Sequence, residues 1–191
     1  MFIKTEDTPN PLTLKLIPGR PVMEEGAREF GSAHEAASSP LAESLFDIDG
    51  VQRVFFAPDY LTVTKAFGVD WKTIRAPILA AVMDFYASGE PLIRTGSDGA
   101  AAGHAEGEYD ADTAAIVEEI KDLLDTRIRP AVAQDGGDIT FSRFEPETGV
   151  VWLHMRGACA GCPSSAMTLK SGVENMLRHY VPEVTAVEQT L

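Results

Sequence analysis

The sequence predicts an α+β fold in which a flexible linker joins two small α/β sandwich domains. Short stretches of alternating apolar and polar residues, typical of half-buried strands, are interspersed with longer stretches whose apolar residues recur at helical spacing. A Gly-rich, acidic stretch over residues 95–110 divides these patterns into two groups. The length of 191 residues is enough for two small domains, which we expect at residues 1–94 and 111–191.

The first group of patterns predicts the order strand, strand, helix, strand, strand, helix. Ser38 or Ser39 can cap the short first helix, because Pro40 fits the first turn that follows. Pro77 lies inside the second helix pattern, where it either kinks the helix or marks its true start. The predicted ranges are 2–5 and 12–16 for the first two strands, a short helix from about residue 40, 51–56 and 59–65 for the next strands, and 71–87 for the last helix.

The second group predicts the order helix, strand, strand, helix, strand. Asp112 is a plausible cap for the first helix, and Pro130 lies where that helix is expected to stop. A turn over residues 135–138 precedes the first strand. The predicted ranges are 113–129 for the first helix, 139–144 and 150–155 for the paired strands, 163–180 for the second helix and 184–187 for the last strand.

The formal net charge of −13 is unevenly distributed along the chain. Residues 1–94 hold 9 basic and 13 acidic side chains, net −4, whereas residues 95–191 hold 7 and 16, net −9. Nucleic-acid binding needs clustered Lys and Arg, so this balance argues against a nucleic-acid partner. The sequence has no run of about 18 apolar residues, so we expect no transmembrane helix and no membrane partner.

Residues 1–7 carry acidic side chains early and lack the basic start and apolar core of a secretory signal. We therefore expect an intracellular protein, cytoplasmic in a bacterium, or located in the mitochondrial matrix if it is a processed organelle protein. In such a reducing compartment, two cysteines separated by two residues suit metal or redox chemistry better than a structural disulfide.

Cys159 and Cys162 lie between a strand pattern and a helix pattern, and four interpretations of the pair compete. They can be two buried structural thiols, or a thioredoxin-like redox pair, although only 29 residues follow Cys162 and a thioredoxin fold needs more. They can form part of a zinc site, but no histidine follows them at finger-like spacing, so zinc would have to be shared between two chains. The fourth interpretation is an iron–sulfur cluster to which each of two chains contributes two thiolates.

Glycine and alanine surround the two cysteines, which allows a loop to wrap closely around a cluster. The positive N-terminus of the following helix would stabilise thiolates and an anionic cluster. The four histidines of the chain, His34, His104, His154 and His179, fit a metal site less well, since none follows the cysteines at finger-like spacing. His104 lies in the linker, His154 alternates with core-facing strand residues, and His179 lies at the far end of the predicted helix.

Several segments resemble a known family. Asp-Gly-Gly-Asp-Ile at 135–139, Gly-Ala-Cys-Ala-Gly-Cys-Pro-Ser-Ser at 157–165 and Leu-Lys-Ser-Gly-Val-Glu at 169–174 are similar to the NifU-like C-terminal (Nfu) domain. The first domain is similar to the Nfu N-terminal domain at residues 2–6, 8–11, 39–42 and 54–56. The resemblance covers nearly the whole chain outside the linker.

This resemblance implies an iron–sulfur cluster carrier or late scaffold and not an enzyme. It implies that Cys159 and Cys162 bind a [4Fe–4S] cluster shared across a homodimer, although four thiolates also hold [2Fe–2S]. The implied partners are upstream cluster assembly proteins and apo iron–sulfur enzymes, with residues 1–94 in an accessory, target-contacting role. A thiol-disulfide oxidoreductase that uses the same cysteine pair remains the alternative function.

Overall fold

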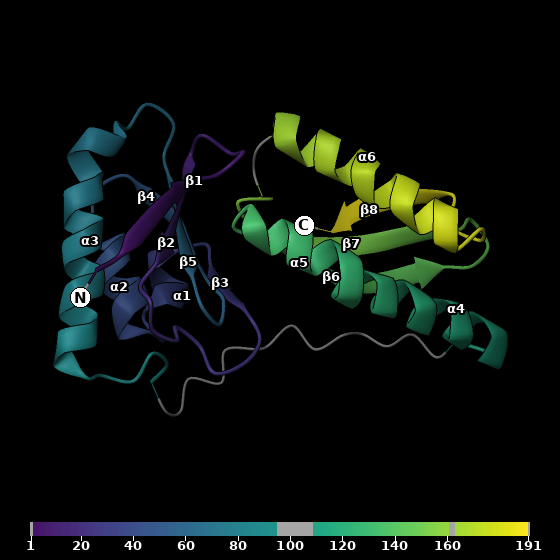
Figure 1. The fold of residues 1–191 in the computed structure, drawn as a ribbon, viewed down its shortest axis with the longest axis horizontal. Coiled ribbons are helices and arrows are strands. Elements are labelled where there is room, and N and C mark those ends of the chain that lie inside the picture. Colours follow the sequence, from purple (N-terminus) through teal and green to yellow (C-terminus); the bar gives the residue numbers. More distant parts are fainter. Residues whose placement is uncertain (1, 95–108, 161–162, 191) are drawn as a thin grey trace. The chain divides into compact units, whose positions relative to one another are not determined.

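The computed structural model describes residues 2–94, 109–160 and 163–190. It is an α+β structure, as the sequence predicts, and it divides into two compact units, Met1–Ala101 and Ala102–Leu191 (Figure 1). Among the described residues, no helix is both long enough and apolar enough to cross a membrane. The two units are described separately below.

The N-terminal unit contains an antiparallel five-stranded sheet in the order β1-β2-β5-β4-β3. The predicted strands and helices are present, and two short elements are added to them. β3 and α1 were not expected because three and four residues are too few to show a period. The elements are β1 (Lys4–Asp7), β2 (Thr13–Ile17), β3 (Arg28–Phe30), α1 (Ala33–Ala36), α2 (Pro40–Phe46), β4 (Val51–Phe56), β5 (Leu61–Lys65) and α3 (Trp71–Ser88).

Both main helices of this unit begin where a polar side chain caps them. The hydroxyl of Ser39 accepts a hydrogen bond from the backbone N–H of Ala42, which places Pro40 in the first turn of α2, as predicted. The carboxylate of Asp70 caps α3 in the same way, and α3 continues through Pro77. Pro77 therefore does not mark the start of this helix.

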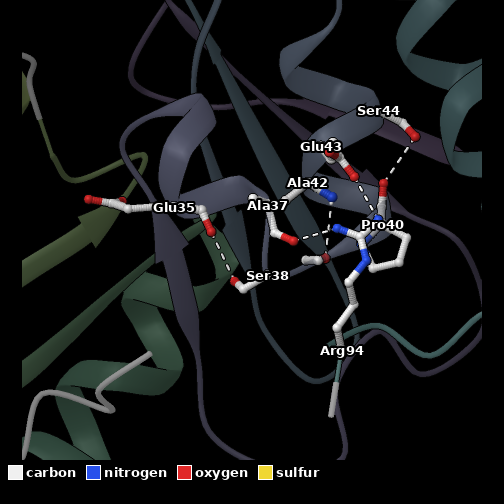
Figure 2. A network of polar contacts seen from close by, with 9 residues as sticks. Glu35, Ala37, Ser38, Pro40, Ala42, Glu43, Ser44 and Arg94 are labelled. Atoms are coloured by element: carbon white, nitrogen blue, oxygen red, sulfur yellow. Dashed lines mark hydrogen bonds and ion pairs between the residues drawn. The ribbon is translucent and has the colours of Figure 1, made fainter. Parts of the chain in front are cut away.

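Arg94 ties the segment after α3 to the turn between α1 and α2 (Figure 2). Its backbone N–H donates to the carbonyl of Ser38 at 2.9 Å, and its guanidinium donates to the carbonyl of Ala37. The guanidinium also pairs with the carboxylate of Glu43 at 2.6 Å. Both side chains of this ion pair are about half exposed, so the pair contributes at most about 1 kcal/mol and serves mainly to fix the path of the chain.

The C-terminal unit has the predicted order, with a three-stranded sheet in the order β6-β7-β8. β6 and β7 are antiparallel, whereas β8 pairs with β7 in parallel after α6. α4, η1 and α5 follow one another directly and form a nearly continuous helix (Figure 1). The elements are α4 (Ala111–Leu123), the π-helical turn η1 (Leu124–Ile128), α5 (Arg129–Gln134), β6 (Gly137–Glu145), β7 (Val150–Gly157), α6 (Pro163–Tyr180) and β8 (Ala186–Thr190).

Two details of the first helix differ from the prediction. Asp110, not Asp112, is the cap, because its carboxylate accepts the N–H of Thr113 at 2.8 Å, and this hydrogen bond lowers the pKa of Asp110. The helix also does not stop at Pro130. The wider turn of η1 places Pro130 in the first turn of α5, where its missing N–H costs no hydrogen bond.

The helices of this unit pack on one face of its sheet. Val151, Leu153 and Met155 alternate along β7, are buried, and belong to the same apolar core as residues of α4, η1, α5 and α6. Trp152 and His154 lie between them in the sequence and do not belong to this core. The sheet therefore has a face packed against the helices and a face turned away from them.

Candidate functional site

The loop that follows β7 is fixed to the turn that precedes β6. The backbone N–H of Ala158 donates to the carbonyl of Gly136 at 3.0 Å, and that of Ala160 donates to Gly157 at 3.1 Å. Gly136 and Gly157 have φ angles of +79° and +64°, which residues with a side chain rarely adopt. These contacts bring the 135–138 turn and the cysteine loop together, although the two lie about 20 residues apart in the sequence.

The thiol of Cys159 lies against Gly137 in the core of the unit. Only 5% of Cys159 is exposed, and it forms no disulfide with a described residue. A Cβ at position 137 would overlap the Sγ of Cys159 and lie 3.1 Å from the carbonyl oxygen of Arg156. Gly137 thus leaves the space that the thiol occupies. The sequence alone could not show this packing, because it depends on the register of β6 against β7.

Cys162, the second predicted ligand, lies outside the described residues. α6 begins at Pro163, directly after it, and extends for 18 residues. The unsatisfied N–H groups of a helix start favour negative charge and lower the pKa of a thiol nearby. The position of the pair in the chain therefore suits thiolates, the form of cysteine that binds metal.

The described histidines of the C-terminal unit do not gather with Cys159. His154 is on the face of β7 turned away from the helices, as predicted, and its Nδ1 lies 2.6 Å from the hydroxyl of Thr190. His179 is exposed and stacks edge-on against Tyr180 at 4.9 Å, whereas His104 is outside the described residues. Across the described parts of the chain, no three His, Cys, Asp or Glu side chains gather as they would to hold a metal ion.

A partly buried ion pair supports the turn beneath the loop, and no local pattern in the sequence indicates it. The guanidinium of Arg129 donates to both carboxylate oxygens of Asp138, at 2.8 and 3.3 Å. Its other contact, with Asp125 at 2.9 Å, is much more exposed. The hydrogen bond to Asp138 is the main cause that raises the pKa of Arg129 above its ordinary value. Because Asp138 directly follows Gly137, this pair fixes the strand against which Cys159 packs.

We expect Gly137→Ala to destabilise the C-terminal unit by about 1–3 kcal/mol, because the added methyl group overpacks the thiol site. It should also push Cys159 toward solvent and raise the rate at which a thiol reagent modifies it. Urea unfolding and the kinetics of thiol modification measure the two effects. Gly172→Ala on α6 is the matched control, since its new Cβ has no atom within 4 Å. Equal behaviour of the two variants would contradict the packing described here.

Comparisons with known proteins find matches for both parts of the chain. Residues 3–89 match the family model described as scaffold protein Nfu/NifU N terminal, and residues 120–188 match the NifU-like domain. The chain is 56% identical over 189 residues to NifU-like protein 4, mitochondrial, of Arabidopsis thaliana, covering 99% of this chain and 66% of that protein. It is 49% identical over 192 residues to the human NFU1 iron-sulfur cluster scaffold homolog, mitochondrial, covering 100% and 72%.

The chain spans about two thirds of the length of these relatives. A solved structure of a NifU-like protein from Saccharomyces cerevisiae is also similar, with a TM-score of 0.46 and 26% identity over 50% of this chain and 86% of that one. The names of the two relatives place those proteins in mitochondria, and neither supports a bacterial cytoplasmic location.

Proposed function

This chain belongs to the Nfu family of iron–sulfur cluster scaffold proteins, and from that premise we propose that it carries a [4Fe–4S] cluster between two copies and delivers it to apo-proteins. In this proposal Cys159 and Cys162 of each copy are the ligands. The observation that carries the proposal is the position of a two-thiol loop at the start of α6, while no cluster of three or more His, Cys, Asp or Glu side chains forms a complete site within the described residues. A cluster needs four ligands, so a second copy has to supply the other two.

Because Cys159 is buried, we infer that the loop has two arrangements, one without a cluster and one with a cluster bound. In the structure its thiol is packed against Gly137, whereas a cluster between two copies has to be reached by the thiols of both. We infer that the loop turns the thiol outward when the cluster binds. Ala158 and Ala160 carry small side chains and the loop begins at a glycine, so this rearrangement displaces little apolar surface.

Ligand exchange accounts for delivery in chemical terms. Thiolates of the recipient replace the cysteine sulfurs in turn, and the cluster moves with its iron, sulfide and charge unchanged. The recipient thiols lose their protons as they bind iron, and the released cysteines take protons up. Two ligands from each copy give a shared, exposed cluster, which suits transfer better than permanent storage.

The remaining roles follow from the same proposal. Upstream assembly proteins supply the cluster, apo iron–sulfur proteins receive it, and residues 1–94 provide an accessory contact with these partners. The relatives are named as mitochondrial proteins, which supports a mitochondrial location for this chain over a bacterial cytoplasm. The thioredoxin-like alternative has less support, because the described residues after Cys162 form one helix and one strand, fewer elements than a thioredoxin fold requires.

Anaerobic reconstitution with iron and sulfide tests the proposal. We expect visible charge-transfer absorbance, and we expect this signal to pass to an apo [4Fe–4S] enzyme whose activity then appears. A chelator added before the transfer should leave activation intact if the cluster moves directly. Protein that gains no absorbance, or that reduces insulin disulfides at the rate of a thioredoxin, would contradict a carrier function.

A further inference from the structure

The face of the C-terminal sheet turned away from the helices presents two arginines beside a tryptophan. Trp152 and Arg156 alternate with the core residues of β7, so both lie on this face. A bulge between Phe141 and Arg143 shifts the register of β6 and places Arg143 directly opposite Trp152. Without the bulge, Arg143 would point into the core two residues after Phe141.

The two arginines of this face form no ion pair within the described chain, although carboxylates lie on the same face. The guanidinium of Arg143 lies over the Trp152 ring, 4.6 Å from its centre. Neither Arg143 nor Arg156 forms an ion pair with any residue that the structure describes. Three acidic residues of the same face each have another partner. Asp138 pairs with Arg129, Glu188 pairs with Lys170, and Glu145 accepts a hydrogen bond from the hydroxyl of Thr148.

Trp152 also has an unsatisfied hydrogen-bond donor. Its Nε1 is buried from solvent and has no hydrogen-bond acceptor within the described residues. A buried N–H group without an acceptor costs about 1–3 kcal/mol, so native proteins rarely keep one. A carboxylate bound by Arg143 would supply this acceptor once a small shift of the ring exposes the Nε1 group.

We propose that this arginine–tryptophan face, defined by Arg143, Trp152 and Arg156, docks an acidic segment of the protein that receives the cluster. Arginine pairs with carboxylates through two parallel hydrogen bonds, and the indole N–H is a further donor to them. The proposed delivery function is used only to identify the partner as a recipient. Arg156 precedes Cys159 by three residues, so a segment lying along β7 brings its protein to the cysteine loop.

The charge balance selects an acidic partner. Residues 95–191 carry a net −9, and Arg143 and Arg156 are two of only seven basic residues in that segment, neither of them in an ion pair with a described residue. A basic partner would bind elsewhere on the segment and would be repelled here. A second copy of the chain, which is itself acidic, is the competing occupant, and the experiment below separates it from a recipient.

Fluorescence of Trp152 reports on the face directly. Trp71 and Trp152 are the two tryptophans of the chain, so Trp71→Phe leaves Trp152 as the single emitter. The apo-protein of this variant is titrated with blocked hexaglutamate, and with blocked hexalysine as the peptide control. We expect a saturable change in emission with hexaglutamate alone. Raising the salt concentration should weaken this binding, because the contacts are charged and near the surface.

Two double variants, made in the same background, locate the binding. Arg143→Gln with Arg156→Gln should lower the affinity for hexaglutamate about tenfold or more, since two charge-assisted contacts are lost. Arg127→Gln with Arg178→Gln removes the same charge from exposed positions on η1 and α6, and should leave the affinity unchanged. Thermal unfolding of both variants verifies that they are folded.

Three results would overturn the inference. They are no response of Trp152 to hexaglutamate, equal losses in the two double variants, and an emission change that follows protein concentration without peptide. The last result would assign the face to a second copy. Because the titration uses apo-protein, it stands whether or not a cluster can be loaded. If the unsubstituted protein fails to bind a cluster, the proposed carrier function is contradicted, but the peptide-binding result is unaffected.

Discussion

Replacing either cysteine with alanine is expected to abolish cluster loading. If each copy supplies two of four ligands, Cys159→Ala or Cys162→Ala removes one thiolate from each copy, and only two remain in the pair. Reconstituted variants should contain almost no bound iron and sulfide, and should lack the charge-transfer absorbance of the unsubstituted protein. Iron and sulfide analysis after removal of unbound metal measures the loss.

Met167→Ala is the matched control for these substitutions. Met167 lies on α6 and is 72% exposed, so its truncation keeps both thiols and disturbs little packing. Because Cys159 is itself a core residue, thermal unfolding of the apo-proteins has to accompany the iron analysis. A folded Cys159→Ala or Cys162→Ala protein that still binds a full cluster would show that the ligands have been assigned wrongly.

Asp138→Ala is expected to destabilise the C-terminal unit by about 2–3 kcal/mol. The substitution removes two charge-assisted hydrogen bonds and leaves the guanidinium of Arg129 without its buried partner. The cost is below that of a fully buried pair, because the Arg129 side chain is 36% exposed. Urea unfolding followed through Trp152, in the Trp71→Phe background, gives the free energy of unfolding of this unit.

Asp125→Ala provides an internal comparison, because Asp125 contacts the same arginine from an exposed position. We expect this variant to lose at most about 0.5 kcal/mol. Arg129→Met combined with Asp138→Ala should be more stable than Asp138→Ala alone, since the unpaired charge is then absent. Equal losses of unfolding free energy in Asp125→Ala and Asp138→Ala would show that the Arg129–Asp138 contact is no more important than the exposed Arg129–Asp125 contact.

The two-unit α+β fold and the order of elements in each unit could be predicted because periodicity is a local signal. A cap at Ser38 or Ser39 could be predicted because Pro40 indicates where the helix begins, and the structure has Ser39 in that role. The helix that includes Pro130 could not be predicted, since a π-helical turn upstream changes where the proline falls. A four-residue helix such as α1 similarly leaves no measurable period.

The position of the cysteine loop was predictable, but the contacts that surround it were not. The packing of Cys159 against Gly137 depends on the pairing of two strands, and so does the way that Arg143 faces Trp152. The latter also needs a bulge that reverses the alternation of β6. Such contacts join residues that are distant in sequence, and no local pattern of apolar or polar residues indicates them.

Native mass spectrometry of the anaerobically reconstituted protein tests most directly whether the loop is half of a shared site. The spectrum should show a species with the mass of two chains and one cluster, and removal of the cluster by a chelator should eliminate that species. This result would place the four ligands on two copies, as we propose. A single chain that carries an intact cluster would contradict the account, because Cys159 and Cys162 would then not need a second copy.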